Sequence, residues 1–433
     1  MARNRDILSL CLGTMVCVAL GAPLHAATLL VGPNQTYTAP CAAIAAASAG
    51  DTILIEPVLY QDNTCAWTTN NLTIVGLPGH HGERPHIDDS GLTDTDTTGH
   101  LSQHKAIWVI SGSNTVIKNV ELSGALVSND DGANGAAIRM QGMNLTILNC
   151  YFHDNQDGIL ESNIAGSNIV IKFSEFNHNG VGDPTLDSGY GATHNLYIGH
   201  CASLEFAFNY SHRANVGHLL KSRAAVNYIL YNRLTGEDGT DSYEIDLPNG
   251  GTSYVIGNLV EKGRNSQNDG SSLAYMEEGA NAANPGHDLY VVNNDFVDRD
   301  PNPIAFVTTG SADTTPALLQ NDIFYAVSGS GTPTNQAVAV MKTNFSGDPL
   351  FRSLHRFDYH LQMGSPAIND GSKPGVTNGF DLKPAFEYLH PACGQFRFTV
   401  SIIDIGAYEF GGGGFPLDCR GFPWNDHDRD HDR

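Results

Sequence analysis

The chain has 433 residues, a formal net charge of −23 at pH 7, 46 glycines and only 16% charged residues. Such an acidic chain is unsuited to binding nucleic acid, and its composition argues against long charged surface helices. The sequence contains no phosphate-binding loop, dinucleotide-binding glycine pattern or Cys/His zinc spacing.

The first 26 residues have the pattern of a secretory signal peptide. Two arginines precede an apolar stretch from Ile7 to Leu20, and the segment ends in a suitable cleavage context at Ala26. We expect residues 1–26 to be removed and 27–410 to form one domain. The mature protein is then expected to be secreted or periplasmic. Nothing later in the sequence is apolar enough to cross a membrane, so no membrane partner is expected.

An Ala-rich segment predicts a short helix that caps the N-terminal end of the domain. Residues 41–48 (CAAIAAAS) precede a turn and a first strand at 52–57, a layout that suits a helix over the first coil of a solenoid. Six cysteines lie outside the signal segment, an even number for an oxidising compartment. The expected disulfides are Cys41 with Cys65 and Cys393 with Cys419, whereas Cys150 and Cys201 are interpreted as small buried residues.

A short segment that ends in Asn or Ser recurs along the middle of the chain. Each copy alternates apolar and polar residues, as a strand does, and successive copies are separated by 23 to 36 residues, a spacing typical of solenoids. A strand that recurs once per coil predicts an all-β, single-stranded parallel β-helix. We expect the terminal side chains to stack in one hydrogen-bonded line. The copies end at Asn119, Asn149, Ser174, Asn209, Asn232, Asn258, Asn294 and Asn321.

Two segments near the C-terminus, 348–371 (DPLFRSLHRFDYHLQMGSPAINDG) and 404–410 (DIGAYEF), resemble the terminal coils of right-handed parallel β-helix proteins in the pectate-lyase-like superfamily. The resemblance implies a right-handed fold and no particular chemistry, because that closing sequence occurs on β-helices of several activities. Residues 411–433 are interpreted as a Gly-rich linker and a solvated acidic tail that contains histidine.

The longest spacings between copies locate a candidate cleft. Extra residues in a coil must leave the stack as loops. Segments 177–194 and 261–287 are therefore expected to project as walls, with the compact coils from Asn209 to Asn258 as the floor.

The predicted floor is rich in cations for so acidic a chain. His212, Arg213, His218, Lys221 and Arg223 fall within one coil. Strand alternation places Lys221 and Arg223 together on the outer face, roughly 7 Å apart. An anionic ligand would suit this surface.

The next coil adds carboxylates beside these cations. Alternation in SYEIDLPNGG predicts that Glu244 and Asp246 face outward next to Lys221 and Arg223. One interpretation is a charge ladder that pairs Lys221 with Glu244 and Arg223 with Asp246, each pair contributing up to about 1 kcal/mol. The other is a site for an acidic sugar. Its further candidate residues are His194, Tyr197, His212, Arg213 and His218.

The segment KSRAAVNYILYN is similar to the lysine-bearing coil of the alginate lyase and chondroitinase B family of β-helix lyases, in which a KS-x-x-N pattern carries the base. Lys221, Ser222 and Asn232 match that coil. The resemblance implies β-elimination with Lys221 as base. The family's arginine on the following coil and its upstream calcium-binding acid have no counterpart here. We therefore assign the arginine's role to Arg223. We expect no cofactor, with calcium as the alternative. The sequence identifies no metal ligand.

Removal of the proton alpha to a uronate carboxylate requires positive charge beside that carboxylate. An arginine fork fits a carboxylate, and a lysine becomes a base when a nearby cation or burial lowers its pKa. If neighbouring acids pair with Lys221 in the free protein, they keep it protonated. The alternative proton-transfer groups are then His194, His212, His218, Tyr190 and Tyr197.

Three functions follow from these patterns. The leading hypothesis is a secreted, monomeric polysaccharide lyase acting on an acidic polysaccharide. A glycoside hydrolase would instead use Glu244 with Asp246, or Glu277 with Glu278, as paired carboxylates. A non-catalytic polysaccharide-binding protein would use a row of aromatic residues. The candidates for that row are Tyr190, Tyr197, Tyr228, Tyr231, Tyr254 and Tyr290.

Overall fold

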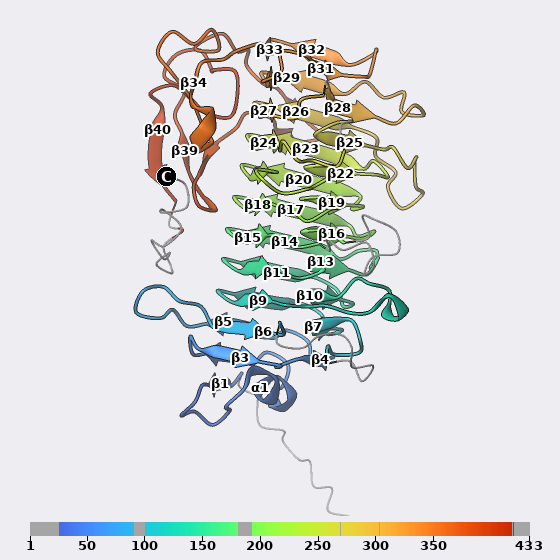
Figure 1. The fold of residues 1–433 in the computed structure, drawn as a ribbon, viewed down its shortest axis with the longest axis vertical. Coiled ribbons are helices and arrows are strands. Elements are labelled where there is room, and N and C mark those ends of the chain that lie inside the picture. Colours follow the sequence, from blue (N-terminus) through green and yellow to red (C-terminus); the bar gives the residue numbers. More distant parts are fainter. Residues whose placement is uncertain are drawn as a thin grey trace, which may run out of the picture.

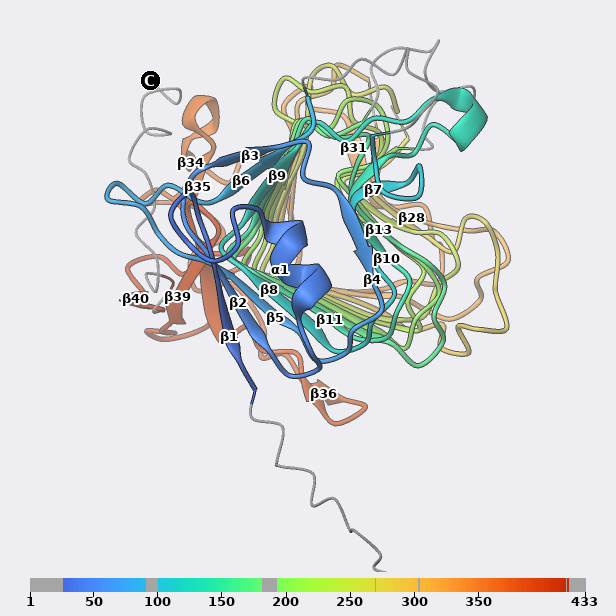
Figure 2. The same ribbon diagram turned by 90° about the horizontal axis from the view of Figure 1, so that it is seen from below.

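The computed structural model describes residues 26–90, 100–180, 193–268, 270–302 and 304–417, together with Cys419. The chain winds into a solenoid with three parallel sheets of twelve, eleven and ten strands, named here sheets A, B and C (Figure 1). Each coil adds one strand to sheet A, then B, then C, so the predicted parallel β-helix is confirmed. Viewed along the axis, the three sheets enclose a common interior (Figure 2).

The strands of the solenoid are short and evenly stacked. Sheet A consists of β1 (Thr28–Val31), β2 (Thr52–Ile55), β5 (Thr73–Gly76), β8 (Thr115–Lys118), β11 (Leu145–Leu148), β14 (Asn168–Lys172), β17 (Ser203–Ala207), β20 (Val226–Leu230), β23 (Thr252–Ile256), β26 (Leu289–Val292), β29 (Leu318–Gln320) and β32 (Val340–Lys342). Sheet B consists of β3 (Leu59–Gln61), β6 (His86–Asp88), β9 (Glu121–Ser123), β12 (Tyr151–His153), β15 (Glu175–Asn177), β18 (Tyr210–His212), β21 (Arg233–Thr235), β24 (Leu259–Lys262), β27 (Asp295–Asp298), β30 (Ile323–Ala326) and β33 (Phe345–Ser346). Sheet C consists of β4 (Cys65–Trp67), β7 (Ala106–Ile110), β10 (Ala136–Met140), β13 (Asp157–Glu161), β16 (Leu196–Ile198), β19 (Lys221–Ser222), β22 (Ile245–Leu247), β25 (Leu273–Tyr275), β28 (Ile304–Thr309) and β31 (Gly331–Thr334).

The interior is built from columns of apolar side chains, one from each coil. In sheet A a single column runs through eight coils, and each of its residues has no exposed surface. Because alternate residues of a strand point to opposite faces, the residues next to this buried column point toward the outer surface. The members of this column are Ile117, Ile147, Ile171, Phe206, Ile229, Val255, Val291 and Leu319.

The recurring Asn residues form two adjacent lines rather than the one line that we predicted. In the inner line the side-chain oxygen of each residue accepts the backbone N–H of its counterpart one coil earlier, as Asn258 does from Asn232 at 2.9 Å. The other line occupies the preceding turn position, where φ is positive. The inner line comprises Ser174, Asn209, Asn232, Asn258, Asn294, Asp322 and Asn344, and the turn line includes Asn119, Asn149, Asn293 and Asn321.

Both positions favour Asn, which is why the sequence pattern merges them. At the turn position Asn tolerates the left-handed conformation better than most residues, as Asn119 (φ 54°) and Asn321 (φ 59°) illustrate. At the inner position the amide both donates and accepts hydrogen bonds within the buried turn. The sequence pattern locates the end of each strand, but it does not show whether the Asn that follows occupies the turn position or the inner position.

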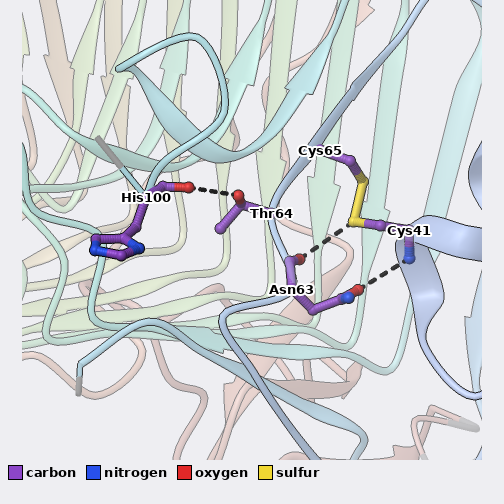
Figure 3. Close-up of a disulfide and its surroundings, with 5 residues drawn as sticks. All are labelled: Cys41, Asn63, Thr64, Cys65 and His100. Atoms are coloured by element: carbon purple, nitrogen blue, oxygen red, sulfur yellow. Dashed lines mark hydrogen bonds between the residues drawn. A yellow bond between two sulfur atoms is a disulfide. The ribbon is translucent and has the colours of Figure 1, made fainter. Parts of the chain in front are cut away.

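A short helix covers the N-terminal end of the solenoid, as predicted. Helix α1 (Pro40–Ala46) buries Ala43 and Ile44 and lies across the open end of the coils (Figure 2). The Cys41–Cys65 disulfide ties this helix to β4, and the backbone N–H of Cys41 also donates to the Asn63 side chain at 2.9 Å (Figure 3).

The other cysteines also lie as predicted. Cys393 and Cys419 form the second disulfide, and Cys150 and Cys201 are buried and unpaired with each other. Two disulfides are consistent with an oxidising compartment. The predicted signal peptide, apart from Ala26, and most of the predicted tail lie outside the described residues. No helix within the described ranges is long and apolar enough to span a membrane.

The C-terminal segment lies along the side of the solenoid, whereas the sequence predicted that it forms terminal coils. The coils end at β33, and the following chain packs back against earlier coils (Figure 1). For example, the Asn293 side chain donates to the backbone carbonyl of Asp404 at 2.9 Å. The predicted Gly-rich linker also contains a strand, β40. The elements outside the three sheets are α1 (Pro40–Ala46), η1 (Asn129–Asp131), η2 (Leu354–Arg356), β34 (Phe351–Ser353), β35 (Asp358–Leu361), β36 (Val376–Thr377), β37 (Phe380–Asp381), β38 (Phe386–Leu389), β39 (Cys393–Arg397) and β40 (Gly413–Pro416).

Candidate functional site

The candidate site lies on the outer face of sheet C, where three consecutive strands each contribute one residue to a row. β16, β19 and β22 pair in a register that sets Tyr197 beside Lys221 and Lys221 beside Asp246. The residue immediately before each of them is an aliphatic side chain with no exposed surface. Alternation therefore directs the three polar side chains away from the core.

Lys221 lies between an aromatic ring and two carboxylates. Its Nζ is 3.1 Å from Asp246 Oδ2, 3.6 Å from Glu278 Oε1 and 5.6 Å from the centre of the Tyr197 ring. Burial raises the pKa of Asp246 to about 6, although the ammonium of Lys221 opposes that rise. Asp246 therefore faces the ammonium of Lys221 as its nearest carboxylate.

Arg223 holds three partners on the rim of this row. Its Nε donates to Tyr197 Oη at 2.8 Å, and its Nη1 donates to Asn249. Its two terminal nitrogens also bind the Glu278 carboxylate at 2.6 and 3.0 Å, a bidentate contact. The hydrogen bond from Arg223 lowers the pKa of Glu278, whose side chain is half exposed. In the free protein, Glu278 therefore occupies the position that a ligand carboxylate would take.

His194 and His218 stack beside the lysine, with ring centres 4.7 Å apart. The backbone N–H of His218 donates to Nδ1 of His194 at 3.0 Å, and the backbone N–H of Tyr243 donates to Nδ1 of His218 at 3.1 Å. Since a backbone N–H can only donate, each Nδ1 is an acceptor, and a neutral ring carries its hydrogen on Nε2.

The environment keeps both rings neutral. Burial, the largest cause, and the positive charge of Lys221 lower the pKa of each histidine well below its usual value. His218 Nε2 lies 3.3 Å from Asp246 Oδ2. The pair therefore offers N–H donors at the site.

Glu244 does not join this group, contrary to the prediction. It is fully buried and lies inside the solenoid, 3.8 Å from Lys262 Nζ. Strand β22 begins only at Ile245, so the alternation that correctly places Asp246 does not extend back to Glu244. The predicted Lys221–Glu244 and Arg223–Asp246 ladder is therefore wrong, and Glu244 and Asp246 do not form a hydrolytic pair on one face.

His212 and Arg213 also lie away from the site. His212 is on β18 in sheet B, stacked on Tyr210 and between two buried glutamates. Arg213 forms ion pairs with Glu237 at 2.8 Å and Asp238 at 2.7 Å. Both residues share a coil with Lys221 in sequence, but a coil crosses all three faces of the solenoid.

The predicted loops and tyrosine row are only partly described. Most of the loop 177–194, including Tyr190, lies outside the described residues, and the other predicted loop contains strand β25. The segment after that strand brings Glu278 to Arg223. Tyr228, Tyr254 and Tyr290 do stack in a column on sheet A, but Phe380 of the C-terminal segment packs on the first two.

Sequence reasoning missed two partners of Arg223. Asn249 follows β22 within a buried turn, and Glu278 was considered only as half of a hydrolytic pair. The register that pairs Lys221 with Asp246 brings the residues that follow β19 and β22, Arg223 and Asn249 among them, close together. The sequence contains no comparable signal for Glu278, because it lies in a loop.

Neither protein-family models nor curated proteins match the chain. Among solved structures, pectate lyase Pel9A is similar with a TM-score of 0.57 and 15% identity, over 89% of this chain and 96% of that chain. A rhamnogalacturonan lyase (TM-score 0.46, 12% identity, 73% and 87% coverage) and the PL6 family polysaccharide lyase Pedsa3628 from Pseudopedobacter saltans (0.35, 13%, 70% and 90%) are also similar. At this identity the likeness to Pel9A shows the fold alone, a right-handed parallel β-helix, as the sequence predicted.

Proposed function

We propose that this protein is a secreted polysaccharide lyase that cleaves a uronate-containing polysaccharide by β-elimination. The observation that carries the proposal is the convergence of Lys221 and Arg223 with Tyr197 on one outward face. Pel9A, whose fold the chain shares, is named as a pectate lyase. An extended, outward-facing row of this kind suits a polymer better than a small molecule enclosed in a pocket.

In the proposed complex the substrate carboxylate replaces Glu278 on the guanidinium of Arg223. The exchange is feasible because Glu278 is half exposed and comes from a loop, whereas Arg223 is held by Tyr197 and Asn249. Positive charge at this carboxylate stabilises the electron density that builds up as the alpha proton leaves. This role is filled by Arg223, so the proposal invokes no metal ion.

Lys221 is the proposed base. In its neutral form Lys221 accepts the alpha proton, and the ammonium that forms lies 3.1 Å from Asp246 Oδ2. The electrons of the C–H bond form the enolate, and their return expels the glycosidic oxygen at the beta carbon. This oxygen takes a proton from water, so the products are an unsaturated sugar end and a new hydroxyl. The neutral His218 and His194 are proposed as N–H donors to the substrate near this oxygen.

The proposal is tested with a panel of uronate polymers, following the ultraviolet absorbance of the unsaturated product. Lys221→Gln should lower the rate by about two to four orders of magnitude, the usual effect of losing a proton-transfer group. Arg223→Lys keeps the charge but loses the fork, and should also reduce activity strongly. Arg213→Lys is the matched control on sheet B and should leave activity unchanged.

Glu278→Gln gives the opposite signature. Removing the competing carboxylate should lower KM for the polymer, since Arg223 is then free to bind it. Polymer shortening without an unsaturated product would indicate hydrolysis and would overturn the lyase assignment. Full activity of both Lys221→Gln and Arg223→Lys would place the chemistry elsewhere on the molecule.

A further inference from the structure

A second cluster of chemically active side chains lies on sheet B, away from the site described above. Three consecutive coils contribute His86 on β6, Glu121 on β9 and His153 on β12. One ligand atom from each of these residues lies within 4.8 Å of the other two. Glu121 Oε1 is 3.1 Å from His153 Nε2 and 3.6 Å from His86 Nδ1.

The hydrogen bonds around His86 fix which of its nitrogens is available. Asp88 accepts hydrogen bonds from the Ser123 hydroxyl at 2.7 Å and from both the hydroxyl and the backbone N–H of Ser90. Because Ser123 has a single hydroxyl hydrogen and donates it to Asp88, its oxygen must accept from His86 Nε2, which is 2.7 Å away. A neutral His86 therefore directs the lone pair of Nδ1 toward Glu121.

His153 is held in a similar way. Its Nδ1 is 2.7 Å from Asp154 Oδ2, and a carboxylate at that distance requires the ring to donate from Nδ1. Tyr151 stacks on the ring with 4.3 Å between centres and so restrains its orientation. Nε2 is then the atom that faces Glu121. Histidine ligands of metals characteristically donate their other nitrogen to a carboxylate or another acceptor in this manner.

We propose that His86 Nδ1, Glu121 and His153 Nε2 form a binding site for a divalent transition-metal ion, with Zn²⁺ as the expected ion. A set of two imidazoles and one carboxylate is a donor combination that zinc accepts, with a fourth position left to water. The side chains of the three residues are 27%, 23% and 16% exposed, so the site is open to ions and to a water ligand.

The distances are close to those that a bound ion requires. Metal–ligand bonds of about 2.1 Å in a tetrahedron place neighbouring ligand atoms roughly 3.4 Å apart. The two measured separations from Glu121 already bracket this value, at 3.1 and 3.6 Å. The two imidazole nitrogens lie within 4.8 Å of each other. Because the ligands come from β6, β9 and β12, the ion would join three consecutive coils and stabilise the N-terminal half of the solenoid.

The simpler alternative is a network of hydrogen bonds without a metal, in which a protonated His153 bridges Glu121 and Asp154. The two explanations predict different numbers of bound metal ions, one per chain for the metal site and none for the hydrogen-bond network. The full chain is stripped with a chelator and titrated with Co²⁺ and then Zn²⁺. We expect one ion per chain, a visible Co²⁺ absorption typical of four-coordination, its loss when Zn²⁺ is added, and a higher unfolding temperature with Zn²⁺.

Variants assign the bound ion to these residues. Glu121→Gln and His153→Gln should each abolish the Co²⁺ absorption and the rise in unfolding temperature. Ser123→Ala leaves all three ligands but removes the group that orients His86, so it should weaken binding about 10- to 100-fold. It also serves as the milder variant if circular dichroism shows that a ligand replacement impairs folding. His360→Gln, in a comparable His–Asp contact on the C-terminal segment, should retain binding.

Three outcomes would overturn the proposal. The first is the absence of any bound Co²⁺ or Zn²⁺ at micromolar concentration, which would favour the metal-free network. The second is unchanged binding in both Glu121→Gln and His153→Gln. The third is binding that disappears when His427 and His431 of the acidic tail are both replaced by Gln, which would show adventitious binding by the tail only.

Discussion

One member of the inner line, Asp322, is a carboxylic acid rather than an amide. We predict that Asp322→Asn stabilises the protein at neutral pH. Oδ1 of Asp322 accepts from the backbone N–H and the side chain of Asn294, both at 2.9 Å, as an Asn at this rung would. Oδ2 is buried without a hydrogen-bond partner among the described residues. At the equivalent rung, Asn294 Nδ2 donates to the backbone carbonyl of Val255 at 2.9 Å. An Asn at 322 could donate in the same direction.

The size of the expected stabilisation follows from the pKa of Asp322. Burial is the main cause that raises the pKa of Asp322 from 3.8 to about 8. The folded protein therefore holds the Asp322 proton more tightly than the unfolded chain does, and stability is lost as the pH rises from about 4 to about 8. The corresponding loss at pH 7 is roughly 4 kcal/mol, at 1.36 kcal/mol per pKa unit. An Asn side chain does not titrate, so Asp322→Asn removes this loss.

The assay is the urea concentration at half-unfolding, followed by circular dichroism from pH 4.5 to pH 8.5. The advantage of Asp322→Asn over the natural chain should be small at pH 4.5 and should grow steadily toward pH 8. Asn258→Asp is the reciprocal control, because it introduces the same defect at another buried rung and should destabilise increasingly with pH. Parallel pH profiles for Asp322→Asn and the natural chain would refute the reasoning.

Two further predictions concern the stability of the solenoid. Asn232→Leu should lower the free energy of unfolding by about 1 to 3 kcal/mol, because the buried backbone N–H of Asn209 loses its acceptor at 2.8 Å; Asn344→Leu, at the less buried end of the same line, should cost less in the same urea titration. Replacing both Cys41 and Cys65 with Ala should cost roughly 3 kcal/mol, since the bond closes a loop between residues 24 positions apart. An unchanged melting temperature for the double variant would contradict the assigned role of that disulfide.

The regular part of the fold was predictable because its pattern repeats. Alternation within each strand and the spacing between copies indicated parallel coils, and the cap helix and both disulfides followed from local sequence and compartment. The C-terminal segment was not predictable in the same way. Residues such as Phe380, which covers the tyrosine column of sheet A, lie far from their contacts in sequence and belong to no repeat.

The same distinction explains which of the predicted residues the structure brings together. Lys221 and Asp246 lie within strands that pair in register, so a period of two residues sufficed to place them on one face. Tyr197 was named as a candidate without being assigned to a face. Glu244 lies one residue before its strand begins, where that period no longer holds. His212 was misplaced for a different reason: nearness in sequence within a coil says nothing about which of the three faces a residue occupies.

In the free protein the cations of the candidate site are already paired with carboxylates of the same chain. This pairing bears on how a substrate would be selected. Lys221 and Arg223 contact two carboxylates, Asp246 and Glu278, and only Glu278 is substantially exposed. Under the proposed function, a ligand would offer a carboxylate that replaces Glu278 at Arg223 while leaving the buried Asp246 in place. A neutral sugar would have to leave Arg223 paired with Glu278 and would gain no ionic contact there. Under the proposed function, competition with this internal carboxylate would select for anionic polymers, in a chain whose overall charge of −23 would otherwise repel them.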